Sequence, residues 1–280
     1  MMNEASRQTE SGERVHAWNP GQYERAAGFV AGQLGADVVE WIGAERFAGR
    51  RVLDLGCGDG DLSERLVELG ADVTGVDSSA TMIAAARKRG IPAEVFDARE
   101  VGEYAAQSTD APACGEASPF DTVFTNATLH WIPEKDRVVA GVRRVLKPGG
   151  VFAGEFGGAG CVVMVREAVR EAGRELFGGE ITPRFPWHFI TEAEFRGILE
   201  AQGFRVRRIL SFDRRPVLPE GIVGWLETFG STIFDEAKVS VKQRRGVWEA
   251  AQAKLESRLY YDGGWHADYV RLRFEATREG

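Results

Sequence analysis

The sequence predicts an α/β fold with a doubly wound, mostly parallel sheet of seven strands, an antiparallel last strand and a helical cap insertion. Three observations predict it. Strand and helix patterns alternate between residues 51 and 156, which is typical of parallel strands joined by right-handed crossovers. Residues 269–277 alternate apolar and polar side chains, which favours a half-exposed antiparallel strand at a sheet edge. Residues 219–261, which precede it, have mostly helical spacing.

The elements of the alternating part follow from apolar spacing and from helix signals. A helix is expected from Gly28 to Ile42, and Ser79 is a favourable N-cap for a later helix. Strands are expected at 51–56, 71–77, 93–98, 120–127 and 151–156. Helices are expected between them at 61–70, 79–89 and 134–150, the last of them stopped by Pro148 and two glycines.

The second half of the chain has longer helical stretches. It predicts helices at 161–177 and 191–203 and a strand at 204–212. Residues 105–119 are small, with Pro and Ser among them, so we expect a mobile surface loop there. The expected divisions are a disordered tail (1–14), an N-terminal helical lid (15–45), the core (46–218), the cap insertion (219–262) and the last core strand (263–280).

Length and composition are those of an ordinary globular enzyme, with 280 residues, 44% of them hydrophobic and 28% charged. The formal net charge of −7 disfavours a duplex nucleic-acid partner, because such a partner requires a basic face. No apolar run approaches the roughly 18 residues that cross a bilayer, and the polar N-terminus lacks the apolar core of a secretory signal. We therefore expect a cytoplasmic protein, monomeric or homodimeric, without a membrane or nucleic-acid partner.

The three cysteines and four histidines are scattered along the chain. Cys57, Cys114 and Cys161 are odd in number and far apart, so they suit neither a disulfide framework nor a zinc site. The histidines are likewise too dispersed for a metal site, and no metal is expected.

The strongest motif is the run VLDLGCGDG from Val52 to Gly60, in which a buried strand ends in a glycine-rich turn that leads into a helix. Glycines let the backbone approach a ligand and adopt dihedral angles that other residues avoid. The amides of the helix N-terminus then face a ligand beyond the carboxyl end of the strand. A tight turn without a ligand is the alternative, because such a turn alone is weak evidence.

Acidic residues around this turn narrow the kind of ligand. A dinucleotide fingerprint has a small residue where this sequence has Asp61, and Asp54 and Asp59 add negative charge. Such a field repels a pyrophosphate but tolerates a nucleoside with a cationic end. Asp77 closes the next strand, where an acid commonly accepts hydrogen bonds from the ribose hydroxyls. The alternative for Asp77 is an acid that only favours a helix N-terminus.

Four segments, in the order DLGCGDG, GVDSSATMIAAARKRG, FDTVFTNATLHWI and LKPGG, resemble the motifs of class I S-adenosylmethionine-dependent methyltransferases over residues 50–156. More narrowly, Trp18-Asn19-Pro20 with Tyr23, DSS-x-MI-x-x-AR and NATLHW are similar to the trans-aconitate methyltransferase group. The resemblance implies a Rossmann-like fold, S-adenosyl-L-methionine as cofactor and methyl transfer to a small acidic or polar molecule, for example a carboxylic acid.

The resemblance also implies residue roles. The cofactor-binding residues would be Trp18, Tyr23, Asp54, Gly56, Gly58, Asp77, Ser78, Met82, Asp97, Ala98 and Asn126. Met82 would pack on the adenine and Asp97 would meet its amino group, while Asn126 would begin the segment beside the sulfonium. Trp18 and Tyr23 would form a lid over the cofactor. Ordinary core packing for Met82, a surface turn for Asp97 and simple packing for the two lid residues are the alternatives.

His130 and Trp131 follow the strand at 120–127, at the mouth where the methyl group should point. His130 is the candidate catalytic residue, because a histidine can take a proton from a hydroxyl or thiol acceptor. The alternative is a histidine that only positions the loop or the cofactor. A carboxylate acceptor needs no base and only cationic or hydrogen-bonding clamps. The candidate substrate-binding residues are Trp131, Trp187, His188 and Arg215, with structural roles as the alternative.

Two other function classes stay open at this point. One is a regulatory or interaction protein that binds the cofactor without turnover. The other is a nicotinamide-dependent oxidoreductase, which the acidic residues of the turn disfavour.

Overall fold

The computed structural model describes residues 18–104, 120–237 and 239–280, so the expected tail (1–14) and loop (105–119) lie outside the described residues. The chain divides into two compact units. The sheet unit comprises Phe29–Cys161, Trp187–Arg214 and Tyr269–Gly280. The helical unit comprises Met1–Gly28, Val162–Pro186 and Arg215–Asp268, of which the description begins at residue 18. The sequence-based division into lid, core and cap stays a prediction.

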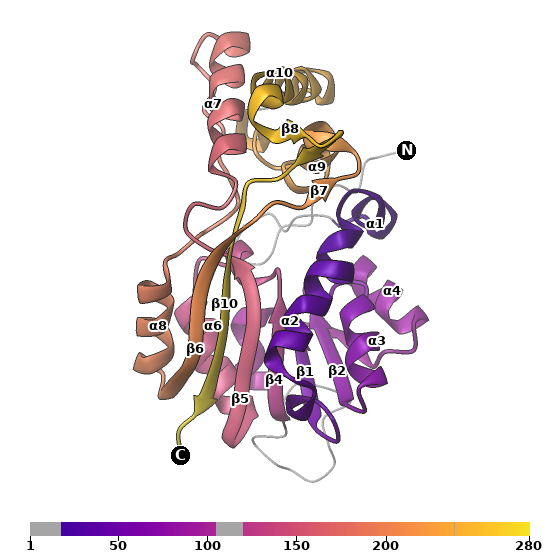
Figure 1. Ribbon diagram of the computed structural model, residues 1–280, viewed down its shortest axis with the longest axis vertical. Coiled ribbons are helices and arrows are strands. Elements are labelled where there is room, and N and C mark those ends of the chain that lie inside the picture. The colour runs from indigo at the N-terminus through magenta and orange to yellow at the C-terminus, as the bar shows by residue number, and fades with distance from the viewer. Residues whose placement is uncertain (1–17, 105–119, 238) are drawn as a thin grey trace. The chain divides into compact units, whose positions relative to one another are not determined.

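The sheet unit contains seven strands in the order β3-β2-β1-β4-β5-β10-β6 (Figure 1). The strands are β1 (Arg51–Leu55), β2 (Asp72–Asp77), β3 (Ala93–Val95), β4 (Phe120–Asn126), β5 (Leu146–Gly157), β6 (Phe204–Arg214) and β10 (Tyr269–Arg278). The pairs among β1 to β5 are parallel, whereas β10 is antiparallel to both of its neighbours. The predicted fold class, a mostly parallel sheet of seven strands with an antiparallel last strand, is therefore confirmed.

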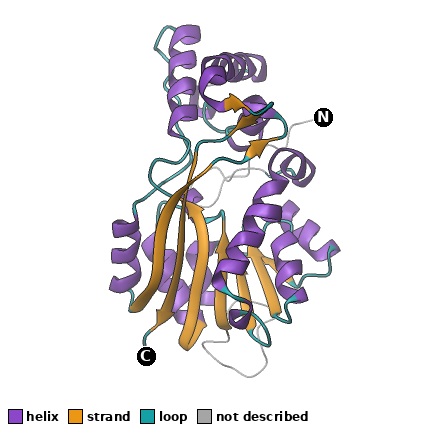
Figure 2. Ribbon diagram, in the orientation of Figure 1, coloured by secondary structure: helices purple, strands orange, loops and turns teal. Residues whose placement is uncertain are grey.

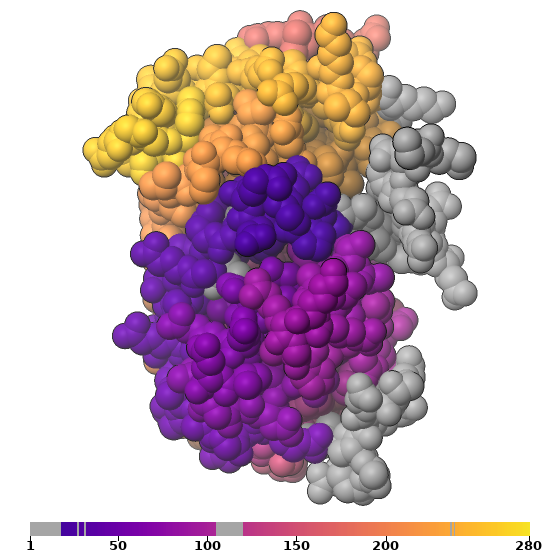
Figure 3. All heavy atoms as spheres, turned by 90° about the vertical axis from the view of Figure 1, so that its right-hand side faces the viewer, coloured from indigo at the N-terminus to yellow at the C-terminus, as the bar shows by residue number. Residues whose placement is uncertain are grey.

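Helices cover both faces of this sheet (Figure 2). The helices of this unit are α2 (Gly35–Ile42), α3 (Asp61–Glu68), α4 (Ala80–Lys88), α6 (Lys135–Val145) and α8 (Glu192–Ala201), whereas α1 (Pro20–Phe29) belongs to the helical unit except for its last residue. Apolar side chains of α2 and α3 form one core with buried side chains of β1, β2 and β5 on the sheet face that these helices cover. Side chains of α6 and α8 form a second core on the opposite face. In the space-filling view of Figure 3, the purple and magenta atoms of the segment with α3 and α4 form a continuous outer surface.

The predicted N-cap is confirmed, because the Ser79 side chain accepts a hydrogen bond from the Met82 N–H at 3.4 Å. The helix expected at 134–150 is wrong at its end. It stops at Val145, and Leu146 already pairs with Phe120 as the first residue of β5. The stretch LKPGG therefore belongs to a strand, since Pro148 and the two glycines that follow cannot continue a helix.

The expectation that residues 269–277 form a half-exposed edge strand is wrong. β10 lies between β5 and β6, and β6 is the edge. The polar side chains of β10 are nevertheless buried: Arg271 is 3% exposed, Arg273 7% and Glu275 2%. They tolerate burial because each is paired with an opposite charge on a neighbouring element.

The helical unit is built from α7 (Val163–Phe177), α9 (Gly221–Phe229) and α10 (Val241–Leu259), with α7 and α9 packed against α10. It also contains a three-stranded sheet, in the order β7 (Val217–Leu218), β9 (Gly264–His266) and β8 (Tyr260–Tyr261). These strands are too short for sequence periodicity to reveal them. Within the described ranges, no helix combines the length and the apolar character needed to cross a membrane.

Candidate functional site

The sheet order places the candidate site at the carboxyl ends of β1 and β4. The chain leaves β1 toward β2 and β3 on one side and returns to β4 on the other, so the connections after β1 and β4 diverge. In open α/β sheets such a switch point forms a crevice that binds ligands. The glycine-rich turn follows β1, and the segment from Asn126 to Trp131 follows β4.

The glycine-rich turn is held against β2 by backbone hydrogen bonds. The N–H groups of Gly56 and Cys57 both donate to the carbonyl of Val76, at 2.8 and 3.0 Å. Gly56 has a φ of +79°, and a Cβ at this position would lie 2.1 Å from Thr128 Oγ1. Only glycine fits here, because the end of β4 approaches the turn too closely for a side chain.

Asp77 connects the end of β2 to this turn. Its Oδ2 accepts a hydrogen bond from the Gly58 N–H at 3.1 Å, and its Oδ1 accepts one from the Ser79 N–H at 2.8 Å. Burial raises the pKa of Asp77, and these two hydrogen bonds oppose that effect. A Cβ built on Gly58 would meet nothing within 4 Å, so the space next to this glycine, whose N–H binds Asp77, is open. Each carboxylate oxygen can accept a further hydrogen bond, so this space suits a diol.

Asp54 is a buried acid below the turn. Its carboxylate accepts a 2.6 Å hydrogen bond from the Ser63 hydroxyl, which places it between β1 and α3. Burial raises the pKa of Asp54 to about 7, although the hydrogen bond from Ser63 opposes the shift and the charge of Asp77 adds to it. A cation bound nearby would favour the ionised form of this group. Its carboxylate thus supports the predicted negative field only while it is ionised.

The segment after β4 contains a strained residue and an unpaired oxygen. Ala127 has a φ of +54°, which residues other than glycine seldom adopt. The Asn126 Nδ2 donates to the Val30 carbonyl at 3.4 Å, while the buried Asn126 Oδ1 has no hydrogen-bond partner in the described part of the chain. A buried amide oxygen without a partner costs stability unless a ligand satisfies it. Asn126 therefore suits a donor group of a ligand, such as an ammonium.

Four of the predicted cofactor-binding residues, two of them expected at the adenine, lie on the segments that follow β2 and β3 and differ in exposure. Met82 is 3% exposed on α4 and Ala98 is 9% exposed, whereas Ser78 is exposed. Asp97 caps the short helix η3 (Ala98–Glu103), and the Arg99 guanidinium donates to both of its carboxylate oxygens. Partial burial would raise the pKa of Asp97, but the hydrogen bonds from Arg99 outweigh it and lower the pKa. Any ligand at Asp97 thus meets a carboxylate already paired with an arginine.

His130 lies in the short helix after β4 and is buried against the end of β5. Its Nδ1 accepts a hydrogen bond from the Gly157 N–H at 3.3 Å. Burial, and then the positive charges of Arg271 and Lys135, lower the pKa of His130 well below its ordinary value. The imidazole is therefore neutral with its proton on Nε2, so it presents a donor and not a free basic nitrogen. This geometry favours the alternative of a positioning histidine over a general base.

Two aromatic side chains lie against the His130 ring, and a third contacts both of them. Phe189 stacks on His130 with 5.8 Å between ring centroids, and Trp131 lies at 5.6 Å. Trp187 contacts both Trp131 and Phe189. The structure thus brings the predicted Trp131 and Trp187 together with His130, and it adds Phe189, which the sequence argument did not select.

A buried lysine fixes this aromatic cluster to the turn after β4. The Lys135 Nζ donates to the carbonyls of Ile132 and His188, each at 2.8 Å, and the His188 N–H donates to the His130 carbonyl at 2.7 Å. Burial lowers the pKa of Lys135 to about 8, and the charge of Glu134 opposes this. The backbone of His188 therefore holds the cluster together, while its side chain is exposed.

Arg271 is a site residue that the sequence argument missed. It is the third residue of β10 and pairs with Gly157, the last residue of β5. Its Nε donates to Glu155 at 2.9 Å, but its buried Nη2 has no hydrogen-bond partner among the described residues. An alternating strand makes such an arginine look solvent-exposed in sequence, and only the sheet order reveals its burial. Arg271 can offer a guanidinium N–H to an anionic group.

The remaining predicted site residues lie in the helical unit. Trp18 and Tyr23 contact each other and Phe229 edge-on, with centroid distances of 5.6 to 6.1 Å. Arg215 is exposed and near the carboxylate of Asp268. Their predicted roles as lid and as substrate-binding residue stay predictions.

No group of three or more histidine, cysteine or acidic side chains suited to a metal ion occurs in the described ranges. Cys57 and Cys161 are both buried.

Comparisons with known proteins agree with this geometry. A family described as "Methyltransferase domain" matches residues 53–152. An uncharacterized methyltransferase of Schizosaccharomyces pombe is 33% identical over 271 residues, which cover 94% of this chain and 98% of that protein. A trans-aconitate 2-methyltransferase of Delftia acidovorans is 34% identical, but over only 49% of this chain and 47% of its own. Magnesium protoporphyrin IX methyltransferase from Synechocystis, solved with S-adenosylhomocysteine, has a similar fold, with a TM-score of 0.52, 17% identity, and coverage of 89% of this chain and 83% of that one.

Proposed function

Since this chain belongs to the class I S-adenosylmethionine-dependent methyltransferases, we propose that it transfers the methyl group to a small-molecule acceptor that carries a carboxylate. The observation that carries the proposal is the buried Arg271 Nη2, which has no partner in the described part of the chain. Arg271 is close enough to His130 for its charge to lower the pKa of that histidine. A guanidinium there would bind and orient a carboxylate by a charge-assisted hydrogen bond.

S-adenosylmethionine is the methyl donor, and it supplies an already activated methyl group on a sulfonium. The protein therefore has to bind the cofactor and the acceptor, align them and exclude water. Alignment alone can lower a reaction barrier by roughly 7–11 kcal/mol. We propose that Asp77 accepts hydrogen bonds from the ribose hydroxyls in the open space beside Gly58, and that the Asn126 Oδ1 accepts one from the ammonium group. The carboxylate of Asp54 would stabilise the positive charge.

The acceptor side of the proposal needs no base, because a carboxylate is already ionised at neutral pH. His130 would then act as a positioning residue, with its Nε2–H available as a donor since its Nδ1 is occupied. Trp131, Trp187 and Phe189 would exclude water around it. The Delftia acidovorans relative is a trans-aconitate 2-methyltransferase, which supports a carboxylic acid as the class of acceptor here.

The test is an assay of S-adenosylhomocysteine release over a panel of carboxylic acids, phenols and thiols. We expect turnover on a carboxylic acid, and Arg271→Gln should raise the acceptor KM at least about tenfold while cofactor affinity stays unchanged. Arg273→Gln is the matched control, because Arg273 is also buried and paired with Glu155 but two residues away on the same strand. Turnover only on phenols, thiols or macromolecules would refute the carboxylate proposal, and cofactor binding without any turnover would favour a regulatory protein.

The ribose assignment has its own test. Asp77→Ala should weaken S-adenosylmethionine binding at least tenfold, roughly 1.4 kcal/mol, because both the ribose acceptor and the hydrogen bond to the Gly58 N–H are lost. Isothermal titration calorimetry measures the effect. Asp72→Ala is the control, since Asp72 is exposed at the opposite end of the same strand. Unchanged affinity in folded Asp77→Ala protein would show that the ribose binds elsewhere.

A further inference from the structure

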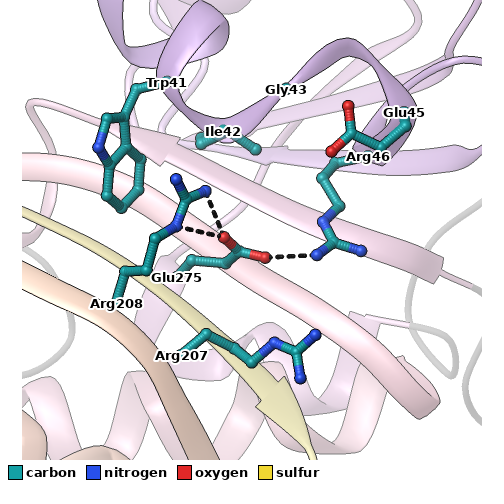
Figure 4. Close-up of a pocket in the computed structure, with 8 residues that line it drawn as sticks. All are labelled: Trp41, Ile42, Gly43, Glu45, Arg46, Arg207, Arg208 and Glu275. Carbon is teal, nitrogen blue, oxygen red and sulfur yellow. Dashed lines mark hydrogen bonds and ion pairs between the residues drawn. The ribbon is translucent and has the colours of Figure 1, made fainter.

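A second pocket lies in the sheet unit, at the end of the sheet opposite the glycine-rich turn. It has a volume of about 450 Å³, within the size range of small-molecule sites. Its walls come from the end of α2 and the turn before β1, from the beginning of β6 and from the end of β10 (Figure 4). The lining residues are Trp41, Ile42, Gly43, Glu45, Arg46, Arg207, Arg208 and Glu275. Because it lies at the amino ends of the parallel strands, it is separate from the methyl-transfer site.

A β-bulge in β6 brings two consecutive arginines to this pocket. Glu275 of β10 pairs with Arg208, whereas Ala276 pairs with Val206, so Arg207 is an extra residue without a register partner. Successive side chains of a regular strand point to opposite faces, and a bulge redirects one of them. Arg207 and Arg208 consequently both line the pocket.

Glu275 fixes two of the three arginines in place. Its side chain is 3% exposed and accepts hydrogen bonds from Arg46 Nη2 at 2.8 Å and from Arg208 Nε at 2.9 Å (Figure 4). The Arg208 guanidinium also lies over the Trp41 ring, 3.8 Å from its centroid. These contacts keep both guanidinium groups ordered before any ligand binds, which lowers the entropy cost of binding.

Positive charge remains after this pairing. The Arg207 side chain makes no ion pair or hydrogen bond with the described residues, and the buried Arg46 Nε has no partner there. The lining holds three guanidinium groups against two carboxylates, in a chain whose formal net charge is −7. A local excess of guanidinium groups on an acidic protein attracts anions, and the planar fork of arginine suits phosphoryl and carboxylate oxygens.

We propose that this pocket binds a small organic anion with at least two negative charges, carried by a phosphoryl group or by paired carboxylates. Arg207 would make the direct contact, and Arg46 and Arg208, held by Glu275, would complete the positive wall. The bulge gives the proposal a structural basis, since a regular strand would turn Arg207 to the other face of the sheet.

The test is calorimetry of the full chain with three probes, inorganic phosphate, pyrophosphate and citrate, against sodium chloride at matched ionic strength. We expect saturable binding of at least one multivalent probe, and Arg207→Gln should weaken it at least about tenfold. A preference for the phosphates or for citrate identifies the charged group. Arg205→Gln is the matched control, because Arg205 is an exposed arginine two residues away on β6 and outside the pocket.

Two outcomes would overturn the proposal. One is the absence of binding beyond the effect of ionic strength. The other is an equal loss in Arg205→Gln and Arg207→Gln, which would indicate a diffuse surface effect. Thermal unfolding of both variants shows whether they are folded, and no loss of stability is expected, because Arg207 has no ion pair with the described residues to break.

Discussion

Glu155→Ala is expected to lower the free energy of unfolding by about 3–5 kcal/mol, because it removes the carboxylate from a buried charge cluster. Glu155 is fully buried in β5. It accepts hydrogen bonds from Arg271 Nε at 2.9 Å and Arg273 Nε at 2.7 Å, and Arg214 lies 3.4 Å away. Without it, the buried guanidinium groups of β10 would lose their counter-charge, and burying an unpaired charge is costly.

Urea unfolding followed by circular dichroism measures this change. Glu200→Ala is the control, because Glu200 forms an exposed ion pair with Arg196 on α8. Exposed pairs of this kind contribute about 0.5 kcal/mol or less. A similar loss in the two variants would mean that the buried cluster is not a major source of stability. Glu155→Gln should fall between them, since the amide keeps an acceptor oxygen but not the charge.

The same cluster shows where sequence reasoning stops. The alternation of β10 predicted a half-exposed strand, because polar residues at every second position usually face water. Here that polar face meets Glu155, which is 116 residues away in sequence from Arg271. A pattern within one strand cannot reveal a partner on another strand. Arg271, the residue proposed to bind the acceptor carboxylate, was missed for this reason.

Features that depend on a few adjacent residues were predictable. The turn after β1 and the Ser79 N-cap follow from glycine dihedrals and a hydroxyl at one position, and the structure confirms the cap. The seven-stranded sheet is predictable for a different reason, because the alternation of strand and helix patterns extends over about a hundred residues, and it is confirmed. The small sheet of the helical unit and the bulge at Arg207 were not predictable, because two-residue strands and register shifts leave no periodic signal.

Gly56→Ala is expected to reduce S-adenosylmethionine affinity by at least about 100-fold. This is the largest loss of binding that we predict, although the substitution adds only one methyl group. The added Cβ would lie 2.1 Å from Thr128 Oγ1 and 2.7 Å from Thr128 Cβ. Thr128 cannot easily retreat, because its hydroxyl lies within hydrogen-bonding distance of the carbonyls of Gly56 and Asn126. The turn would therefore move away from the end of β4, and the ligand-binding atoms on the two loops would separate.

Calorimetry with S-adenosylmethionine, together with thermal unfolding, separates this effect from general backbone strain. Gly49→Ala is the matched control, because Gly49 also has a positive φ, +67°, but a Cβ there meets nothing within 4 Å. Both variants should lose roughly 1–2 kcal/mol of stability from the left-handed conformation. Only Gly56→Ala should lose binding, since only its methyl group collides with the opposite side of the crevice. If folded Gly56→Ala protein bound the cofactor as tightly as Gly49→Ala, the crevice between β1 and β4 would not be the cofactor site.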